Sequence, residues 1–245
     1  MDKKQWQQKG QGHRARLRDR FLEKGINSFS DTEVLELLLS FGTPRADCKE
    51  QARALLQKFG SFGQVLDAPL SLLQEVKGVG PKNSFALRFV QGVAQRYLRE
   101  RIRGKHYLHV AADVADYLVF SMRGLKREVF TVIFLDSSHA VIESETVAEG
   151  TVNLNTIYPR EIIAKALKHN AAALVVAHNH PSGSLVPSAK DITLTKTLHF
   201  LSSAMQLQLL DHLIIGDGVY SFNEKGIMDT IRKDTQKVMA ALRRD

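Results

Sequence analysis

Two histidines and an aspartate in the second half of the chain have the types and spacing of a metal site. His178 and His180 follow a short apolar run, residues 174–177. Because residues two apart in a strand point to the same side, both imidazoles can reach one ion. Pro181 ends the strand, and Asp191, at the start of an expected helix, can return a carboxylate to the same point.

This donor set indicates hydrolytic chemistry. Two histidines and one carboxylate, with a fourth position left for water, form the usual pattern of a catalytic zinc centre. Bound Zn²⁺ lowers the pKa of its water to about 7, which provides hydroxide at neutral pH. We therefore expect His178, His180 and Asp191 to hold one Zn²⁺ per chain.

Other interpretations account for parts of the same segment. His-x-His pairs also occur by chance in loops. Ser188 and Asp191 have the spacing of a helix cap, with Ser188 as N-cap and Asp191 at the third helical position. The cap and the metal site are compatible, because a capped helix start can aim its first turn into a cleft. The letters His-Asn-His carry almost no weight as an HNH nuclease signature, since that motif disperses its residues along a ββα unit.

The elements that must position these residues fall into two parts. Up to about residue 98 the pattern predicts helices without strands, over residues 14–23, 31–39, 47–60, 69–76 and 82–97. The charged residues 101–105 are the expected boundary, between a helical domain at 1–103 and a second domain at 104–245 whose core covers about 123–245. In the second domain we expect strands over 129–135, 141–147, 171–177 and 209–215, with helices at 114–120, from Pro159 and at 191–201. The fold class is therefore α+β.

Charge and composition restrict the partners and the compartment. The net charge is +8, and residues 1–100 hold 17 Lys and Arg against 11 Asp and Glu. This excess favours a polyanion such as nucleic acid, although a solvated surface would look the same. The single cysteine, Cys48, excludes an internal disulfide and a thiolate-bound zinc. No run of about 18 apolar residues is present and the first residues lack a secretory signal, so we expect a cytoplasmic protein without a membrane span.

A glycine-containing turn in the first part resembles a helix-hairpin-helix. Lys77, Gly78, Gly80 and Lys82 lie in or beside the sequence Val76-Lys77-Gly78-Val79-Gly80-Pro81-Lys82. In that motif the glycines let backbone N–H groups approach a DNA phosphate, and the following helix N-terminus favours an anion. The alternative is an ordinary turn between two helices. The motif predicts DNA binding to the backbone without sequence specificity, weakened by salt.

The metal-site segment also carries a family resemblance. His178-Asn179-His180-Pro181 followed by Ser188-x-x-Asp191 resembles the JAMM motif of MPN/JAB metalloproteases. Further segments of the sequence are similar to the bacterial RadC family: Arg127-Glu128-Val129-Phe130, Gly150-Thr151-Val152-Asn153, Pro159-Arg160-Glu161, Ala177-His178-Asn179-His180-Pro181-Ser182-Gly183 and Asp211-His212-Leu213-Ile214-Ile215-Gly216. The resemblance implies an MPN/JAB-like, cytidine-deaminase-like α/β domain with a mixed sheet, after a helical helix-hairpin-helix region.

The resemblance also implies roles for single residues. Glu128, at the start of the first strand, matches the glutamate that moves protons, and a carboxylate beside activated water can do so. Ser188 would donate a hydrogen bond to the developing oxyanion. Glutamates 143, 145 and 149 are rivals for the role of Glu128, unless they are exposed hairpin charges. Asn179 departs from the Ser or Thr of many isopeptidases, which puts the substrate in doubt but not the metal.

Three functions follow from these features. The first is a zinc-dependent peptidase or isopeptidase that acts on a protein or peptide in a DNA-associated context. The second is a metal-dependent nuclease for branched DNA in repair or recombination, and the third is a DNA-binding scaffold without catalysis. Among the remaining histidines, we expect His212 to be a hydrogen-bonded structural residue, and His169 and His199 to be surface groups.

Overall fold

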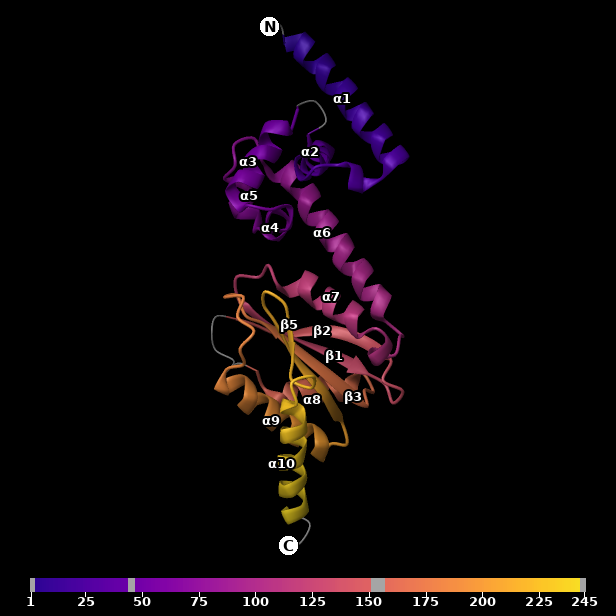
Figure 1. The fold of residues 1–245 in the computed structure, drawn as a ribbon, viewed down its shortest axis with the longest axis vertical. Coiled ribbons are helices and arrows are strands. Elements are labelled where there is room, and N and C mark those ends of the chain that lie inside the picture. The colour runs from indigo at the N-terminus through magenta and orange to yellow at the C-terminus, as the bar shows by residue number, and fades with distance from the viewer. Residues whose placement is uncertain (1–2, 44–46, 151–156, 243–245) are drawn as a thin grey trace. The chain divides into compact units, whose positions relative to one another are not determined.

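The computed structural model describes residues 3–43, 47–150 and 157–242, with side chains from residue 12 to residue 241 apart from the gaps. The chain divides into two compact units, Met1–Ala94 and Gln95–Asp245. The division lies inside helix α6 (Pro81–Ile102), which Figure 1 shows as one continuous ribbon. The last turns of α6 belong to the second unit because Leu98 and Ile102 pack into its core. The boundary expected at residue 103 lies just after the end of this helix, whereas the two compact units divide at residue 94.

The first unit is helical in its described part. It contains α1 (Lys3–Lys24), the short 3₁₀ helix η1 (Ile26–Ser28), α2 (Asp31–Gly42), α3 (Lys49–Phe59), α4 (Phe62–Asp67), α5 (Leu70–Gln74) and the start of α6. Its core is built from buried leucines of four helices: Leu35, Leu39, Leu55, Leu73 and Leu87. Ser30 caps α2, and Glu33 completes the capping box. A helix over this segment was expected, whereas α4 was not; Ser61 begins α4 by accepting a hydrogen bond from Gln64 N.

The second unit is built on a mixed sheet of five strands in the order β2-β1-β3-β4-β5. The strands are β1 (Glu128–Leu135), β2 (Val141–Gly150), β3 (Ala173–Asn179), β4 (Gln208–Ile215) and β5 (Val219–Ser221). β3 and β4 are parallel, and all other neighbours are antiparallel. The helical first region and this mixed sheet confirm the expected α+β class. β3, at the centre, is buried along its whole length, which explains its apolar sequence.

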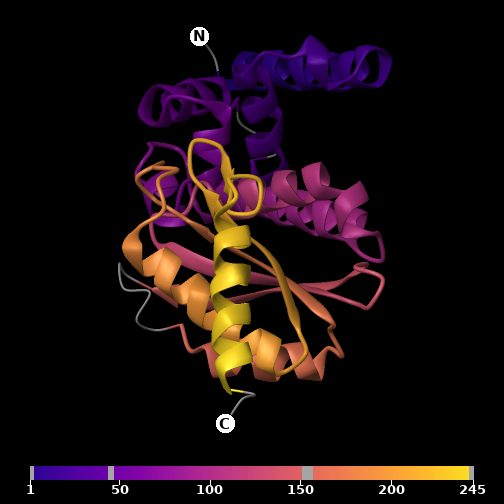
Figure 2. The same ribbon diagram turned by 60° about the horizontal axis from the view of Figure 1, so that its bottom comes forward.

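Helices cover both faces of the sheet (Figures 1 and 2). On one face, α7 (Ala111–Met122), which follows the 3₁₀ helix η2 (Tyr107–His109), packs Val114, Leu118 and Met122 against strand residues such as Ile133 and Val175. The other face is covered by α8 (Pro159–Lys168), α9 (Ala189–Ala204) and α10 (Ile227–Leu242). Residues of β1 and β3 that share this second face are Phe130, Val132, Leu174 and Val176. His178 continues that alternation, so it lies on the face that α9 covers.

Several boundaries differ from the sequence-based expectation. β3 begins at Ala173 and runs through His178 to Asn179, so His178 is part of the strand rather than after it. β5, which has only three residues, and α10 were not expected. Thr151, Val152 and Asn153, which contribute to the family resemblance, lie outside the described residues. Within the described part, no helix combines the length and apolarity that crossing a membrane requires.

Candidate metal centre

The three expected ligands come from two elements and one turn. His178 is the sixth residue of β3, His180 follows the end of that strand, and Asp191 is in the first turn of α9. The connecting loop turns tightly against the end of β4. A Cβ at Gly183 (φ +80°) would stand 2.7 Å from the Asp217 carboxylate, and a Cβ at Gly216 would stand 2.4 Å from the Gly183 carbonyl oxygen. Glycine is therefore favoured at Gly183 by its positive φ and at Gly216 by the close approach of the Gly183 backbone.

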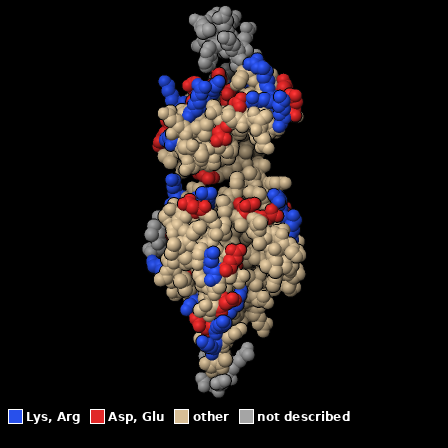
Figure 3. Space-filling model, viewed as in Figure 1, with Lys and Arg blue, Asp and Glu red and all other residues tan. Residues whose placement is uncertain are grey.

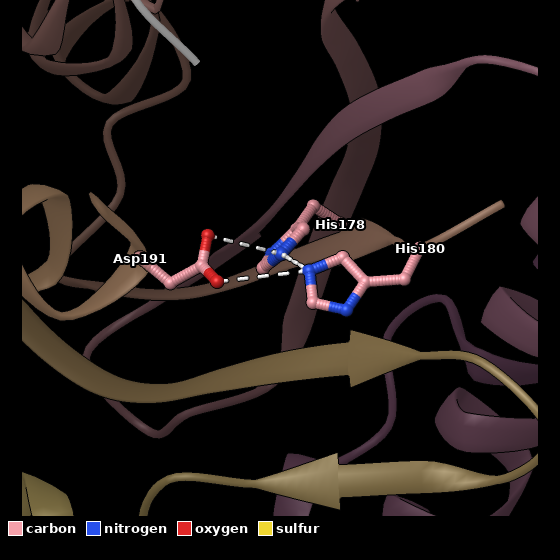
Figure 4. A group of neighbouring side chains, drawn as sticks. All are labelled: His178, His180 and Asp191. Carbon is pink, nitrogen blue, oxygen red and sulfur yellow. Dashed lines mark hydrogen bonds and ion pairs between the residues drawn. The ribbon is translucent and has the colours of Figure 1, made fainter. Parts of the chain in front are cut away.

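The side chains of the three residues converge (Figure 4). His178 Nε2 lies 3.2 Å from Asp191 Oδ1, His180 Nε2 lies 3.6 Å from Asp191 Oδ2, and the two Nε2 atoms are 3.0 Å apart. His178 and Asp191 are fully buried, and the His180 side chain is 12 % exposed. Among the residues that the structure describes, this is the one cluster of three or more His, Cys, Asp or Glu residues with ligand atoms within 4.8 Å of one another.

The helix cap that competed with the metal interpretation is present as well. Ser188 Oγ accepts from Asp191 N at 3.1 Å, and Asp191 Oδ2 accepts from Ser188 N at 2.7 Å. This capping box holds the Asp191 carboxylate in place through one oxygen. Asp191 Oδ1 is buried and accepts no hydrogen bond from the described residues. The cap therefore orients the carboxylate and leaves one buried oxygen directed at the histidines.

The other ring nitrogen of each histidine is engaged elsewhere. His180 Nδ1 lies 3.0 Å from the carbonyl oxygen of Ser184, to which it can only donate, so His180 Nε2 keeps its lone pair. His178 Nδ1 lies 2.8 Å from His212 Nε2. Two imidazole nitrogens and an unsatisfied carboxylate oxygen at this separation repel one another unless a cation or a proton lies between them. The donor set, two nitrogens and one oxygen without sulfur, fits Zn²⁺.

The electrostatics of the site agree with this donor set. Burial by itself raises the pKa of Asp191, whereas the interaction with His178 and the hydrogen bonds from Ser188 lower it, and the lowering prevails. A bound cation acts on the carboxylate in the same direction as a protonated imidazole. Complete burial lowers the pKa of His212 well below its ordinary value, so that ring is neutral at pH 7. Asp191 is therefore ionised beside a neutral His212.

Glu128 is close to the site in the sheet but outside the ligand cluster. It is the first residue of β1, is half-buried, and shares its sheet face with Phe130, which lies opposite His178 in the neighbouring strand. The buried side chain of Asn179 holds the backbone on both sides of Glu128, because Oδ1 accepts from Val129 N at 2.7 Å and Nδ2 donates to Arg127 O at 3.1 Å. No pattern in the residue spacing indicated this contact.

The rival glutamates have other partners. Glu145 accepts from Lys165 Nζ and His169 Nε2, each at 2.6 Å, and Glu149 pairs with Arg127. Glu143 accepts a hydrogen bond from Ser144 N. All three lie on β2, which is an edge strand that β1 separates from β3. The geometry therefore favours Glu128 over the residues of β2.

Two expectations about histidines were wrong. His199 is buried rather than on the surface, because α10 covers it and Thr235 Oγ1 lies 2.8 Å from its Nδ1. His169 is largely buried as well and stacks on Phe134 while it pairs with Glu145. Sequence spacing does not reveal either burial, since the covering elements are distant in the chain.

The hairpin residues of the first unit lie in the turn between α5 and α6 and at the start of α6, and two backbone donors of this turn are occupied. Gly78 has φ +85°, and a Cβ there would stand 2.6 Å from Gln51 Nε2. Val79 N donates to Val76 O, and Gly80 N donates to Asn83 Oδ1 at 2.7 Å. Lys77 and Lys82 are exposed. On the face shown in Figure 3, basic and acidic side chains are intermingled on both units.

Comparisons with known proteins agree with this division of the chain. A family model described as a RadC-like JAB domain matches residues 108–227, and one described as UPF0758 N-terminal matches residues 9–85. A UPF0758 protein of Paraburkholderia xenovorans (strain LB400) is 41 % identical over 210 residues, which cover 85 % of this chain and 83 % of the relative. A UPF0758 protein of Rhodobacter capsulatus is 42 % identical over 213 residues, with 86 % and 100 % covered.

Proposed function

The chain belongs to the UPF0758 family and contains a RadC-like JAB domain of the MPN fold, and on this premise we propose that it is a zinc-dependent hydrolase of peptide or isopeptide bonds. The observation that carries the proposal is the convergence of three ligand atoms. His178 Nε2, His180 Nε2 and the unsatisfied Oδ1 of Asp191 face one another in a largely buried site.

In this proposal His178, His180 and Asp191 hold the ion. When bound, Zn²⁺ supplies a Lewis acid that makes water acidic enough to act as a nucleophile near neutral pH. The capping box fixes the carboxylate of Asp191, and the Ser184 carbonyl fixes the ring of His180. Such partners orient ligands and increase the affinity for the metal.

Two further side chains act on the substrate. The Glu128 carboxylate takes a proton from the attacking water and delivers it to the leaving amine. Ser188 Oγ accepts a hydrogen bond from Asp191 N, so the hydroxyl hydrogen can point outward. Ser188 is exposed at the helix start, where this hydrogen can be donated to the oxyanion of the tetrahedral intermediate.

We also propose that the first unit contacts DNA through its hairpin, which would place the hydrolase in a DNA-associated context. Lys77 and Lys82 support this, because both are exposed and flank the turn around Gly78 and Gly80. Since the amides of Val79 and Gly80 donate within the protein, the contact depends mainly on the two ammonium groups. Such binding reads phosphate charge and weakens with salt.

The experiment that tests the function offers one preparation of zinc-loaded protein two classes of substrate. A peptide library with isopeptide-linked members is incubated beside flapped and branched DNA, with Glu128→Gln protein as the control. We expect cleavage of peptide or isopeptide bonds that the variant loses. Cleavage of DNA alone would replace this proposal with a nuclease, and cleavage of neither substrate class would contradict hydrolysis.

A further inference from the structure

We infer that Thr195 and His212 are positioning residues that keep the ring proton of His178 on Nδ1 and thereby reserve Nε2 for the metal. The inference rests on the proposed zinc site and adds two residues to it. Both residues are completely buried, Thr195 on α9 and His212 on β4. Neither belongs to the ligand cluster.

Three hydrogen bonds connect one ligand to another. Thr195 Oγ1 donates to the backbone carbonyl of Asp191 at 2.6 Å. His212 Nδ1 lies 2.6 Å from Thr195 Oγ1, and His212 Nε2 lies 2.8 Å from His178 Nδ1. The chain of contacts therefore runs from the backbone of one metal ligand, through a hydroxyl and an imidazole, to the side chain of another.

The direction of these bonds follows from the number of protons. A hydroxyl has one proton, and because Thr195 gives it to the Asp191 carbonyl, its oxygen accepts from His212 Nδ1. A neutral imidazole has one N–H, so His212 Nε2 must accept, and it accepts from His178 Nδ1. His178 Nε2 then needs no proton of its own and can bind a cation. The opposite direction would place a proton on His178 Nε2 and block the ligand atom.

Apart from its hydrogen bonds to His178 and Thr195, the ring of His212 packs against aromatic side chains. Its ring lies between Phe130, at 5.7 Å between ring centres, and Phe222, at 4.8 Å. These aromatic rings offer no acceptor for an N–H comparable to the Thr195 hydroxyl. Rotation of the imidazole would leave a buried nitrogen without a partner, which is unfavourable. The packing therefore stabilises one orientation of the ring.

His180 provides an internal comparison. Its Nδ1 donates directly to a carbonyl oxygen, that of Ser184, and a carbonyl can only accept. The tautomer of His180 is therefore set by one contact. The partner of His178 is an imidazole, which can donate or accept, so the tautomer of His178 depends on what holds the far side of that imidazole. Thr195 holds that side.

The test compares three substitutions on α9. Thr195→Val keeps the shape of the side chain but removes the hydroxyl, and Thr195→Ser retains the hydroxyl. Thr197→Val is the matched control, because Thr197 is exposed and its Oγ1 donates to the Thr193 carbonyl in the same way. Zinc affinity is measured by competition with a chromophoric chelator. The tautomer of His212 is read from long-range ¹H–¹⁵N correlations in metal-free and zinc-loaded protein.

We expect Thr195→Val to weaken zinc binding about 10- to 100-fold, the range found for lost partners of metal ligands. We also expect it to change His212 from one Nδ1–H tautomer to a mixture, whereas Thr195→Ser and Thr197→Val match the wild type. A wild-type zinc affinity together with an unchanged His212 tautomer in folded Thr195→Val protein would overturn the inference. Because the tautomer is also measured without metal, this result is distinct from a wild-type protein that binds no zinc, which would overturn the proposed function.

Discussion

The metal centre and the glycine hairpin were both predicted from short motifs. The two regions differ in whether their polar atoms already have hydrogen-bond partners within the protein. At the metal centre the motif residues leave atoms without partners: Asp191 Oδ1 is buried and accepts no hydrogen bond from the described residues. At the hairpin the amides of Val79 and Gly80 already donate to Val76 and Asn83. A motif can thus predict the course of the backbone while function depends on which donors and acceptors remain free.

The largest effect is expected at Glu128, for which we propose a role in proton transfer rather than in metal binding. Glu128→Gln should retain zinc and lower hydrolysis by about 10²- to 10⁴-fold, because the amide cannot take or deliver a proton. Single-turnover assays and zinc analysis on the same preparation measure both properties. Glu149→Gln, on the edge strand, is the control and should keep its activity. Undiminished hydrolysis in Glu128→Gln protein would remove Glu128 from the mechanism.

A smaller effect is expected at Asn179, whose buried side chain supports the backbone around Glu128 but is not one of the proposed ligands. Asn179→Ala leaves Val129 N–H without its acceptor in a buried environment, so we expect a loss of about 1–3 kcal/mol in the free energy of unfolding of the second unit. Hydrolysis should fall while zinc affinity stays, since Asn179 holds the backbone around Glu128. Denaturant unfolding and zinc titration check this. An unchanged midpoint would show that the hydrogen bonds of Asn179 contribute little.

The hairpin can be tested by removing its charges. Lys77→Ala combined with Lys82→Ala should weaken DNA binding and reduce the slope of log K against log salt by about 2, one for each lost phosphate contact. Lys58→Ala is the control in the same unit, because Lys58 Nζ already donates hydrogen bonds to the Glu75 carboxylate and the Leu72 carbonyl oxygen. Zinc content should not change in either variant. Equal DNA affinity in the double variant and the wild type would place DNA contact elsewhere or nowhere.

The smallest effect concerns the cap of α2 in the first unit. Hydrogen bonds from the Ser30 backbone and from Arg20 lower the pKa of Glu33 from about 4.5 to about 2. Because the pKa in the folded state is the lower one, this stabilisation is complete above pH 4.5 and is lost as the pH falls towards 2. With solvent screening we expect about 1 kcal/mol.

Thermal unfolding of the first unit at pH 6 and pH 3 measures this loss. Glu33→Gln should be less stable at pH 6 and should show a flatter dependence over that range. The same pH dependence in the variant and the wild type would assign the loss to other carboxylates. A difference confined to the first unit would separate this cap from that of Ser188 and Asp191.

The sequence predicted that His178, His180 and Asp191 cluster and that Ser188 caps a helix, because both depend on local spacing. His178, His180 and Asp191 are within fourteen positions of one another, and Ser188 caps its own helix. Thr195 meets His212 because α9 packs on β4, and His212 meets His178 because β4 lies beside β3; neither arrangement has a signature in residue spacing. A buried strand that contains a histidine is nevertheless a usable signal, since a polar ring there needs a partner. His199 was misjudged for a related reason, because α10, which covers it, was not expected.

The measurement that tests the central claim most directly is the zinc content and affinity of the purified protein. The account predicts close to one zinc per chain in the wild type, almost none in folded His178→Ala protein, and an unchanged amount in His109→Ala, whose exposed ring lies outside the ligand cluster. A folded wild-type protein that binds no zinc, or His178→Ala protein that keeps its zinc, would contradict the proposed centre.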